Sequence, residues 1–150
     1  MNTADIDRLM SDIPDYVGTF SCDTLPPSSD ARQRRLMIVN TDPSNEPGEH
    51  WVAIYIDSAK RRGEYFDSFG RQPPAIFATY MNDNCSDYWS YNKKQLQSIA
   101  SRVCGYYCVF YCMLRSAGID MFKITSGFTN DTGFNDVLVH GFLCGTAASD

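Results

Sequence analysis

Apolar residues recur at helical spacing in several segments of the chain, and these segments predict the helices. In the first segment the apolar side chains share one face, and Thr3 is placed to cap it. Cys104–Ser116 is the most apolar long segment, and we expect it to form a central buried helix that ends at Gly118. From Gly145 onward the chain is small and polar, and we expect it to fray. The predicted helices are residues 3–10, 73–81, 104–116 and 132–142.

Short runs of β-branched and aromatic residues predict strands in the middle of the chain. Lys60–Gly63 is typical of a hairpin turn, whereas residues 21–34 and 42–49 have the composition of loops. The predicted strands are residues 36–40, 51–56, 64–67 and 88–91. Because the strands cluster between helices, we expect an α+β fold with a central mixed or antiparallel sheet. A buried helix beginning at Cys104 would pack on this sheet beside flanking helices.

Length and composition fit a single domain over residues 1–150. The chain is 43% hydrophobic and 21% charged, and its 150 residues can bury a core without staples. The longest apolar stretch, residues 103–114, is too short and too polar to span a bilayer. The N-terminus is acidic and lacks the apolar core of a signal peptide. We therefore expect an intracellular protein that is not secreted and does not bind membranes.

The balance of charge argues against nucleic acid as a partner. The 13 basic residues face 18 acidic ones, and the net charge is −5, so the chain has no general attraction to phosphates. Basic residues do gather in three short groups, which we interpret as solvated loop and turn residues: Arg32, Arg34 and Arg35; Lys60, Arg61 and Arg62; Lys93 and Lys94.

The cysteines indicate neither disulfides nor structural zinc. The chain has no Cys-x-x-Cys pair, no histidine at zinc-finger spacing and no secretory signal. Cys104, Cys108 and Cys112 recur every four residues, which places them on one helix face. We interpret Cys108 and Cys112 as small buried core residues. We expect no metal and no cofactor.

Cys104 is a candidate nucleophile. At the start of a helix, the dipole and the free N–H groups stabilise a thiolate and lower its pKa. The same N–H groups can donate to an oxyanion, and Gly105 would let a substrate backbone approach closely. The alternative is a buried structural cysteine, and the Cys-Gly pair alone does not decide between the two.

A thiol nucleophile needs a base, and the base needs an orienting group. The chain has two histidines. His50 lies where a loop enters a strand, a position that often presents catalytic groups, whereas His140 lies in the last predicted helix and is better explained as a surface or core-edge residue. Asp67 ends the neighbouring hairpin strand and can hold the second ring nitrogen of His50. Taken alone, Asp67 is better explained as a turn residue.

Gln97 lies seven residues before Cys104, and its amide is a candidate oxyanion donor beside the backbone N–H of Cys104. Gln95 and Gln72 are glutamines too, so the amide by itself is a weak signal. Trp51, directly after His50, either walls a substrate cleft or packs in the core.

Together these motifs resemble the adenovirus-type cysteine protease family, adenain. The likeness covers about residues 5–115 and rests on the following segments: Gly18-Thr19-Phe20, Ile38-Val39-Asn40-Thr41, His50-Trp51, Phe66-Asp67-Ser68-Phe69-Gly70, and Gln97 with Cys104-Gly105 and Cys108. The chain departs from the pattern where Asp67 replaces a glutamate and Ser68 replaces a proline. Related proteases that process ubiquitin-like proteins use Asp. Residues past Gly118 match poorly.

The resemblance implies a cysteine endopeptidase in which Cys104 attacks the scissile carbonyl and His50 moves the proton. Asp67 would orient His50, and Gln97 would hold the oxyanion. By resemblance, the substrates are proteins cut after glycine, such as virion precursors, processed in the host nucleus or the virion. One alternative is a hydrolase of ubiquitin-like proteins, of deubiquitinase or desumoylase type, which would use the same triad. The other is a non-catalytic binding module on this scaffold.

The resemblance also brings two activators into consideration. The adenovirus enzyme is activated by DNA, but the charge of this chain predicts weak or absent DNA binding. That enzyme is also activated by a short viral peptide that adds a strand and forms a disulfide. Cys85 lies 12 residues before Gln97, close to the corresponding position, and a predicted edge strand follows it. Cys85 is therefore a candidate tether for a peptide; the alternative is an unpaired loop cysteine.

Overall fold

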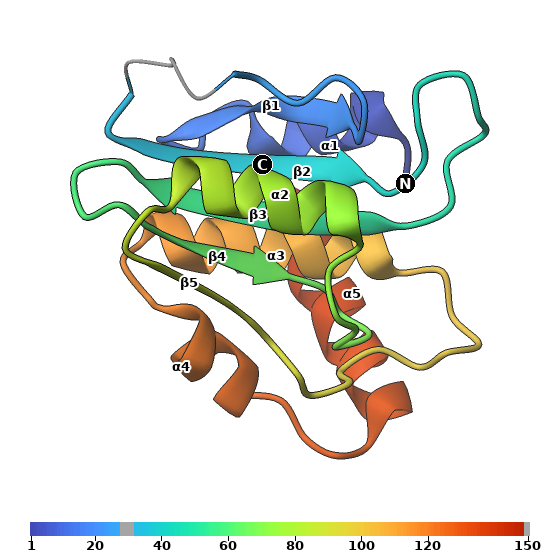
Figure 1. Ribbon diagram of the computed structural model, residues 1–150. Coiled ribbons are helices and arrows are strands. Elements are labelled where there is room, and N and C mark those ends of the chain that lie inside the picture. The colour runs from blue at the N-terminus through green and yellow to red at the C-terminus, as the bar shows by residue number, and fades with distance from the viewer. Residues whose placement is uncertain (28–31, 149–150) are drawn as a thin grey trace.

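A computed structural model describes residues 1–27 and 32–148 and confirms most of the predicted elements (Figure 1). The helices are α1 (Thr3–Met10), α2 (Ala75–Asn84), α3 (Cys104–Ser116), α4 (Met121–Ser126) and α5 (Thr132–Ala148). The strands are β1 (Tyr16–Ser21), β2 (Arg34–Asn40), β3 (Trp51–Asp57), β4 (Arg62–Phe66) and β5 (Tyr88–Tyr91).

Within the described residues the strands form one five-stranded sheet in the order β1-β2-β3-β4-β5. The inner pairs β2–β3 and β3–β4 are antiparallel, and the outer pairs β1–β2 and β4–β5 are parallel. Parallel neighbours need a crossover, which α2 supplies between β4 and β5. The sheet is mixed and the fold is α+β, as the strand and helix order predicts.

Helices cover both faces of the sheet (Figure 1). On one face, α2 packs over a cluster that includes Ile54, Tyr65 and Phe77. On the other face α3 runs along the sheet, with α1 beside it and α5 packed against its outer side. Cys108 and Cys112 of α3 are fully buried, which confirms their interpretation as core residues and α3 as the central helix.

Three elements differ from the prediction. β1 was not expected as a strand, because its interior glycine and uniformly half-buried residues weaken the local pattern; its form depends on pairing with β2. α4 is too short to show periodicity, and it is set by Asp120, whose side chain accepts the Lys123 N–H at 2.9 Å. α5 remains helical to Ala148 instead of fraying from Gly145.

Two smaller corrections concern single residues. The cap of α1 is Asn2 rather than Thr3: Asn2 accepts the Asp5 N–H at 2.9 Å, and Asp5 returns a bond to the Asn2 N–H. Arg35 is not a solvated loop residue. It lies within β2 and is 1% exposed, because the strand begins earlier than predicted. The remainder of the predicted 21–34 loop includes residues 28–31, which lie outside the described residues.

Candidate active site

Cys104, His50 and Asp67 meet at one end of the sheet. His50 immediately precedes β3 and Asp67 immediately follows β4. Because these strands are antiparallel, the start of one and the end of the other lie side by side. Cys104 is the first residue of α3, and it lines the same cavity as His50 and Asp67. The fold thus assembles three residues that are far apart in the chain.

His50 and Asp67 form a close, buried pair. The His50 Nε2 lies 2.7 Å from the Asp67 Oδ1, and the two side chains are 13% and 6% exposed. The same carboxylate oxygen accepts the backbone N–H of Phe69 at 2.9 Å, and the Phe69 ring stacks on the imidazole at 4.7 Å. Since Nε2 faces Asp67, Nδ1 is the ring nitrogen left to exchange a proton with Cys104.

Asn92 holds the backbone of Asp67 through two hydrogen bonds. Its Oδ1 accepts the Asp67 N–H at 2.9 Å, and its Nδ2 donates to the Asp67 carbonyl at 2.6 Å. Asn92 is itself buried, so water does not compete for these bonds. Sequence reasoning missed this residue, because one asparagine after a strand has no distinctive local signal.

The electrostatics of the site favour a thiolate–imidazolium pair. Burial alone would lower the pKa of His50, but its hydrogen bonds with Asp67 and Cys104 raise that pKa to about 9. Burial alone would raise the pKa of Cys104, but the His50 bond and the backbone N–H groups of Trp51 and Gly105 lower it below the usual thiol value. The proton therefore rests on His50 over the range in which Cys104 is ionised.

Gln97 is fully buried beside this pair, and its amide is held at both ends. Its Oε1 accepts the Ser68 hydroxyl at 2.6 Å, and its Nε2 donates to the carbonyl and the hydroxyl of Ser101, each at 3.1 Å. The Gln97 backbone N–H also donates to the Ser68 carbonyl at 3.1 Å. Gln97 and Ser101 line the same cleft as Cys104.

Helix α5 supports the loop that carries Gln97. Asn135 is fully buried and donates to the carbonyls of Leu96 and Thr129 at 3.1 and 2.9 Å. Asp136 accepts the Tyr107 hydroxyl at 2.7 Å, and that hydroxyl also reaches the Leu96 carbonyl at 3.2 Å. These supports were not predicted, because α5 belongs to the part of the chain that matches the adenain pattern poorly.

A cleft of about 900 Å³ opens over the pair, and both predicted substrate-binding residues line it. Trp51 packs against the core and also lines the cleft, and its role in binding substrate stays a prediction. Its indole Nε1 donates to the Met1 carbonyl at 3.1 Å. A Cβ on Gly105 would lie 3.1 Å from the Met1 Sδ and 3.3 Å from the Trp51 Cδ1, so these two side chains pack directly against Gly105.

Of the competing candidates, His140 and Gln95 lie in other surroundings, whereas Gln72 shares the cleft. His140 is on an exposed part of α5, with its Nδ1 3.6 Å from the Cys144 Sγ and its ring 5.1 Å from that of Tyr106. Gln95 donates to the Gln97 carbonyl at 3.0 Å, which makes it a support of the loop. Gln72 lines the cleft.

Cys85 ends α2 and is 4% exposed. A Cβ on Gly63 would lie 2.6 Å from the Cys85 Sγ, so the thiol packs directly on β4, and burial raises its pKa to about 11. β5, which follows it, is the edge strand that was predicted. A peptide tethered through Cys85 therefore requires the turn between α2 and β5 to open, and the tether stays a prediction.

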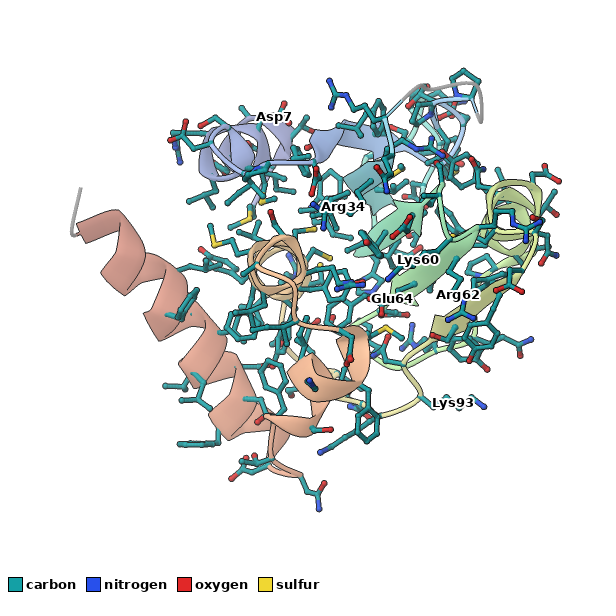
Figure 2. The ribbon with its side chains drawn as sticks, turned by 90° about the vertical axis from the view of Figure 1, so that its left-hand side faces the viewer. Asp7, Arg34, Lys60, Arg62, Glu64 and Lys93 are labelled. Atoms are coloured by element: carbon teal, nitrogen blue, oxygen red, sulfur yellow. The ribbon has the colours of Figure 1, made fainter. Side chains whose placement is uncertain are left out.

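Several basic residues on the surface are neutralised by nearby carboxylates. Of the labelled residues, Lys60 and Arg62 belong to the β3–β4 hairpin, Arg34 begins the neighbouring β2, and Lys93 follows β5 (Figure 2). Arg62 pairs with Asp87 at 2.8 Å, and Arg34 lies 3.7 Å from Asp15. Among the described residues, no helix is long and apolar enough to cross a membrane.

Comparisons with known proteins find similar viral proteases and a similar fold. The "Cysteine protease S273R" of African swine fever virus is 45% identical over 49 residues, covering 29% of this chain and 17% of that protein. The "Protease" of Bovine adenovirus 4 is 27% identical, covering 69% of this chain and 58% of that protein. The crystal structure of the African swine fever virus pS273R protease superposes with a TM-score of 0.64 at 18% identity, covering 93% of this chain and 66% of that one. The chain thus spans less than two thirds of either curated relative.

The fold of the swine fever virus protease confirms the expected architecture. Both sequence relatives are viral: one is named a cysteine protease and the other a protease. Residues 36–121 match the family described as the Ulp1 protease family, C-terminal catalytic domain. That segment contains His50, Asp67, Gln97 and Cys104 and is more than half of the chain. The chain belongs to the Ulp1 family of cysteine proteases.

Proposed function

We propose that the chain is an active endopeptidase with Cys104 as nucleophile, His50 as base and acid, Asp67 as the orienting group and Gln97 as oxyanion donor. The observation that carries this proposal is the buried 2.7 Å His50–Asp67 pair next to a thiol whose pKa is lowered. A purely structural cysteine requires neither the His50–Asp67 pair nor a lowered thiol pKa. A non-catalytic binding module requires none of Cys104, His50, Asp67 and Gln97 in this arrangement.

The reaction follows from where the protons rest. The Cys104 thiolate forms a bond to the scissile carbonyl carbon, and the negative charge moves to the carbonyl oxygen. The Gln97 Nε2–H and the Cys104 backbone N–H donate to that oxygen. His50 gives its proton to the leaving amine as the C–N bond breaks. It then takes a proton from water, which attacks the thioester and restores the thiolate.

The substrates we propose are proteins cut after glycine, including precursors of a DNA virus or a virus-like element. The resemblance to adenain supports cleavage after glycine. The two viral relatives support a viral setting, and the site of action would be inside the infected cell or the virion.

The family also leaves open a hydrolase of ubiquitin-like proteins, which would use the same four residues. Two substrates separate these functions: a short peptide with an internal glycine–glycine bond, and the same sequence fused to a folded ubiquitin-like domain. We expect comparable kcat/KM for both. A preference of more than about a hundredfold for the fusion, equal to about 2.7 kcal/mol of added binding, would favour the ubiquitin-like hydrolase. Cleavage of neither would reject an active peptidase.

A further inference from the structure

Ser68 is the residue after Asp67, and the mechanism above gives it no role. It is 0% exposed, yet it makes three hydrogen bonds to the segment that carries Gln97. Its carbonyl accepts the N–H groups of Leu96 and Gln97 at 2.9 and 3.1 Å. Its hydroxyl donates to the Gln97 Oε1 at 2.6 Å.

Two groups together set the orientation of the Gln97 amide: the Ser101 carbonyl, which can only accept, and the Ser68 hydroxyl, which donates to Oε1. An amide can turn by 180° with little change in shape, exchanging its donor and acceptor ends. In the structure the acceptor end is satisfied by Ser68, so the donor end points to Ser101 and the cleft. A turned amide would set Oε1 against the Ser101 carbonyl and toward the oxyanion, where two oxygens without a shared proton repel each other.

From these contacts we infer that Ser68 is a positioning residue that orients the Gln97 amide for oxyanion binding. This inference rests on the proposed role of Gln97. Ser68 supplies a donor to the Gln97 Oε1 inside a site that water does not reach, and a buried acceptor without a donor is costly. The bond therefore keeps the donor end of the amide on the Ser101 side of the cleft before substrate arrives, and oxyanion sites depend on preorganisation of this kind.

The hydroxyl, rather than the backbone, is the feature in which this chain departs from the adenain pattern. Proline occupies this position in the adenain pattern, and it has a carbonyl but no hydroxyl. Ser68→Ala removes only the hydroxyl and leaves the carbonyl bonds to Leu96 and Gln97 in place. It therefore separates the orientation of the amide from the position of the loop.

The test is a double-mutant cycle on peptide cleavage with Ser68→Ala and Gln97→Ala. We expect Ser68→Ala to lower kcat about tenfold with little change in KM, and Gln97→Ala to lower kcat about a hundredfold or more, as for other oxyanion donors. In the Gln97→Ala background, Ser68→Ala should cost less than about twofold more. Ser116→Ala, at an exposed serine bonded to the Pro14 carbonyl, is the matched control and should leave kcat unchanged.

Two further measurements separate positioning from a merely structural role. A peptide aldehyde adds to Cys104 and leaves a tetrahedral oxygen in the oxyanion site, so its affinity should fall about tenfold in Ser68→Ala, whereas that of the product peptide should not. The rate at which iodoacetamide inactivates the enzyme through Cys104 should stay unchanged. If Ser68→Ala does not fold, judged by thermal unfolding, the comparison of Ser68→Thr with Ser68→Val decides: the threonine keeps the hydroxyl and should keep most of the kcat, whereas the valine has the same shape without it and should lose about tenfold, and equal kcat in both would overturn the inference.

The outcomes distinguish the inference from the proposed function. If Gln97→Ala retains full kcat, the oxyanion role of Gln97 is wrong, and the role of Ser68 fails with it. If Gln97→Ala is impaired but Ser68→Ala retains full kcat, or loses the same factor in both backgrounds, the positioning role of Ser68 is wrong while the proposed function stands. An unchanged aldehyde affinity in Ser68→Ala would also overturn the inference.

Discussion

Replacing Asp67 by asparagine should shift the alkaline limit of activity. In the structure the Asp67 carboxylate accepts from the His50 Nε2 at 2.7 Å. Burial lowers the pKa of His50, and this hydrogen bond is the largest of the interactions that together raise the pKa from 6.5 to about 9. At about 1.4 kcal/mol per pKa unit, that rise corresponds to about 3 kcal/mol favouring the protonated imidazole. Asp67 supplies part of it, and Cys104 supplies the rest.

The sign of the pH effect follows from the raised pKa. The imidazolium is present below the folded pKa of His50 and is lost as the pH rises through it, so activity of the unmodified chain should fall above about pH 9. In Asp67→Asn the His50 pKa returns toward 6.5, so the fall should begin at least about one unit lower. At a fixed neutral pH, kcat/KM should drop more than about tenfold.

The assay is kcat/KM for a glycine-containing peptide across the pH range, together with the pH dependence of inactivation by iodoacetamide. Asp87→Asn is the control, because Asp87 pairs with Arg62 on the surface. Its profile should match that of the unmodified chain. If the activity of Asp67→Asn still falls only above about pH 9, Asp67 does not orient His50, and its assignment as the orienting carboxylate is wrong.

Three other results are expected. Gly105→Ala should raise KM or lower kcat several-fold while retaining the fold, because the new methyl would press on Met1 and Trp51, which line the cleft beside Cys104; unchanged kinetics would show that this packing does not shape the cleft for substrate. DNA should bind more weakly than about 1 μM at physiological salt in a fluorescence-anisotropy titration, and tighter, salt-sensitive binding would contradict the charge argument. A peptide from a partner that pairs with β5 should raise activity, and Cys85→Ser should blunt that rise; full activity without any peptide, unchanged in Cys85→Ser, would reject the tether.

The placement of His50, Asp67 and Cys104 could be predicted from the sequence because each of the three stands at the end of an element. Trp51 opens a clear strand, so His50 is placed at its mouth, and Cys104 opens the most apolar helix. A hairpin with antiparallel strands then brings Asp67 beside His50, whatever the rest of the fold does. Local patterns are therefore sufficient to place two side chains together where both follow from strand ends at the same end of the sheet.

The supporting residues could not be predicted in this way. Asn92 and Asn135 act through buried bonds to backbone groups that are remote in sequence, and an asparagine has the same local signal whether it is buried or solvated. The burial of Arg35 depends on the packing of α2, and β1 depends on its partner strand. Such features depend on tertiary contacts, and the periodicity of residues along the chain carries no information about those contacts.

The most direct test of the central claim is site-mapped labelling by a thiol-reactive probe built on a peptide that ends in glycine. The account predicts one adduct per chain, at Cys104, among the six free thiols. Labelling should be lost in Cys104→Ala, strongly slowed in His50→Ala and unchanged in His140→Ala. Labelling spread over other cysteines would contradict the assignment of the nucleophile. Labelling that is lost in His140→Ala but unchanged in His50→Ala would contradict the assignment of the base.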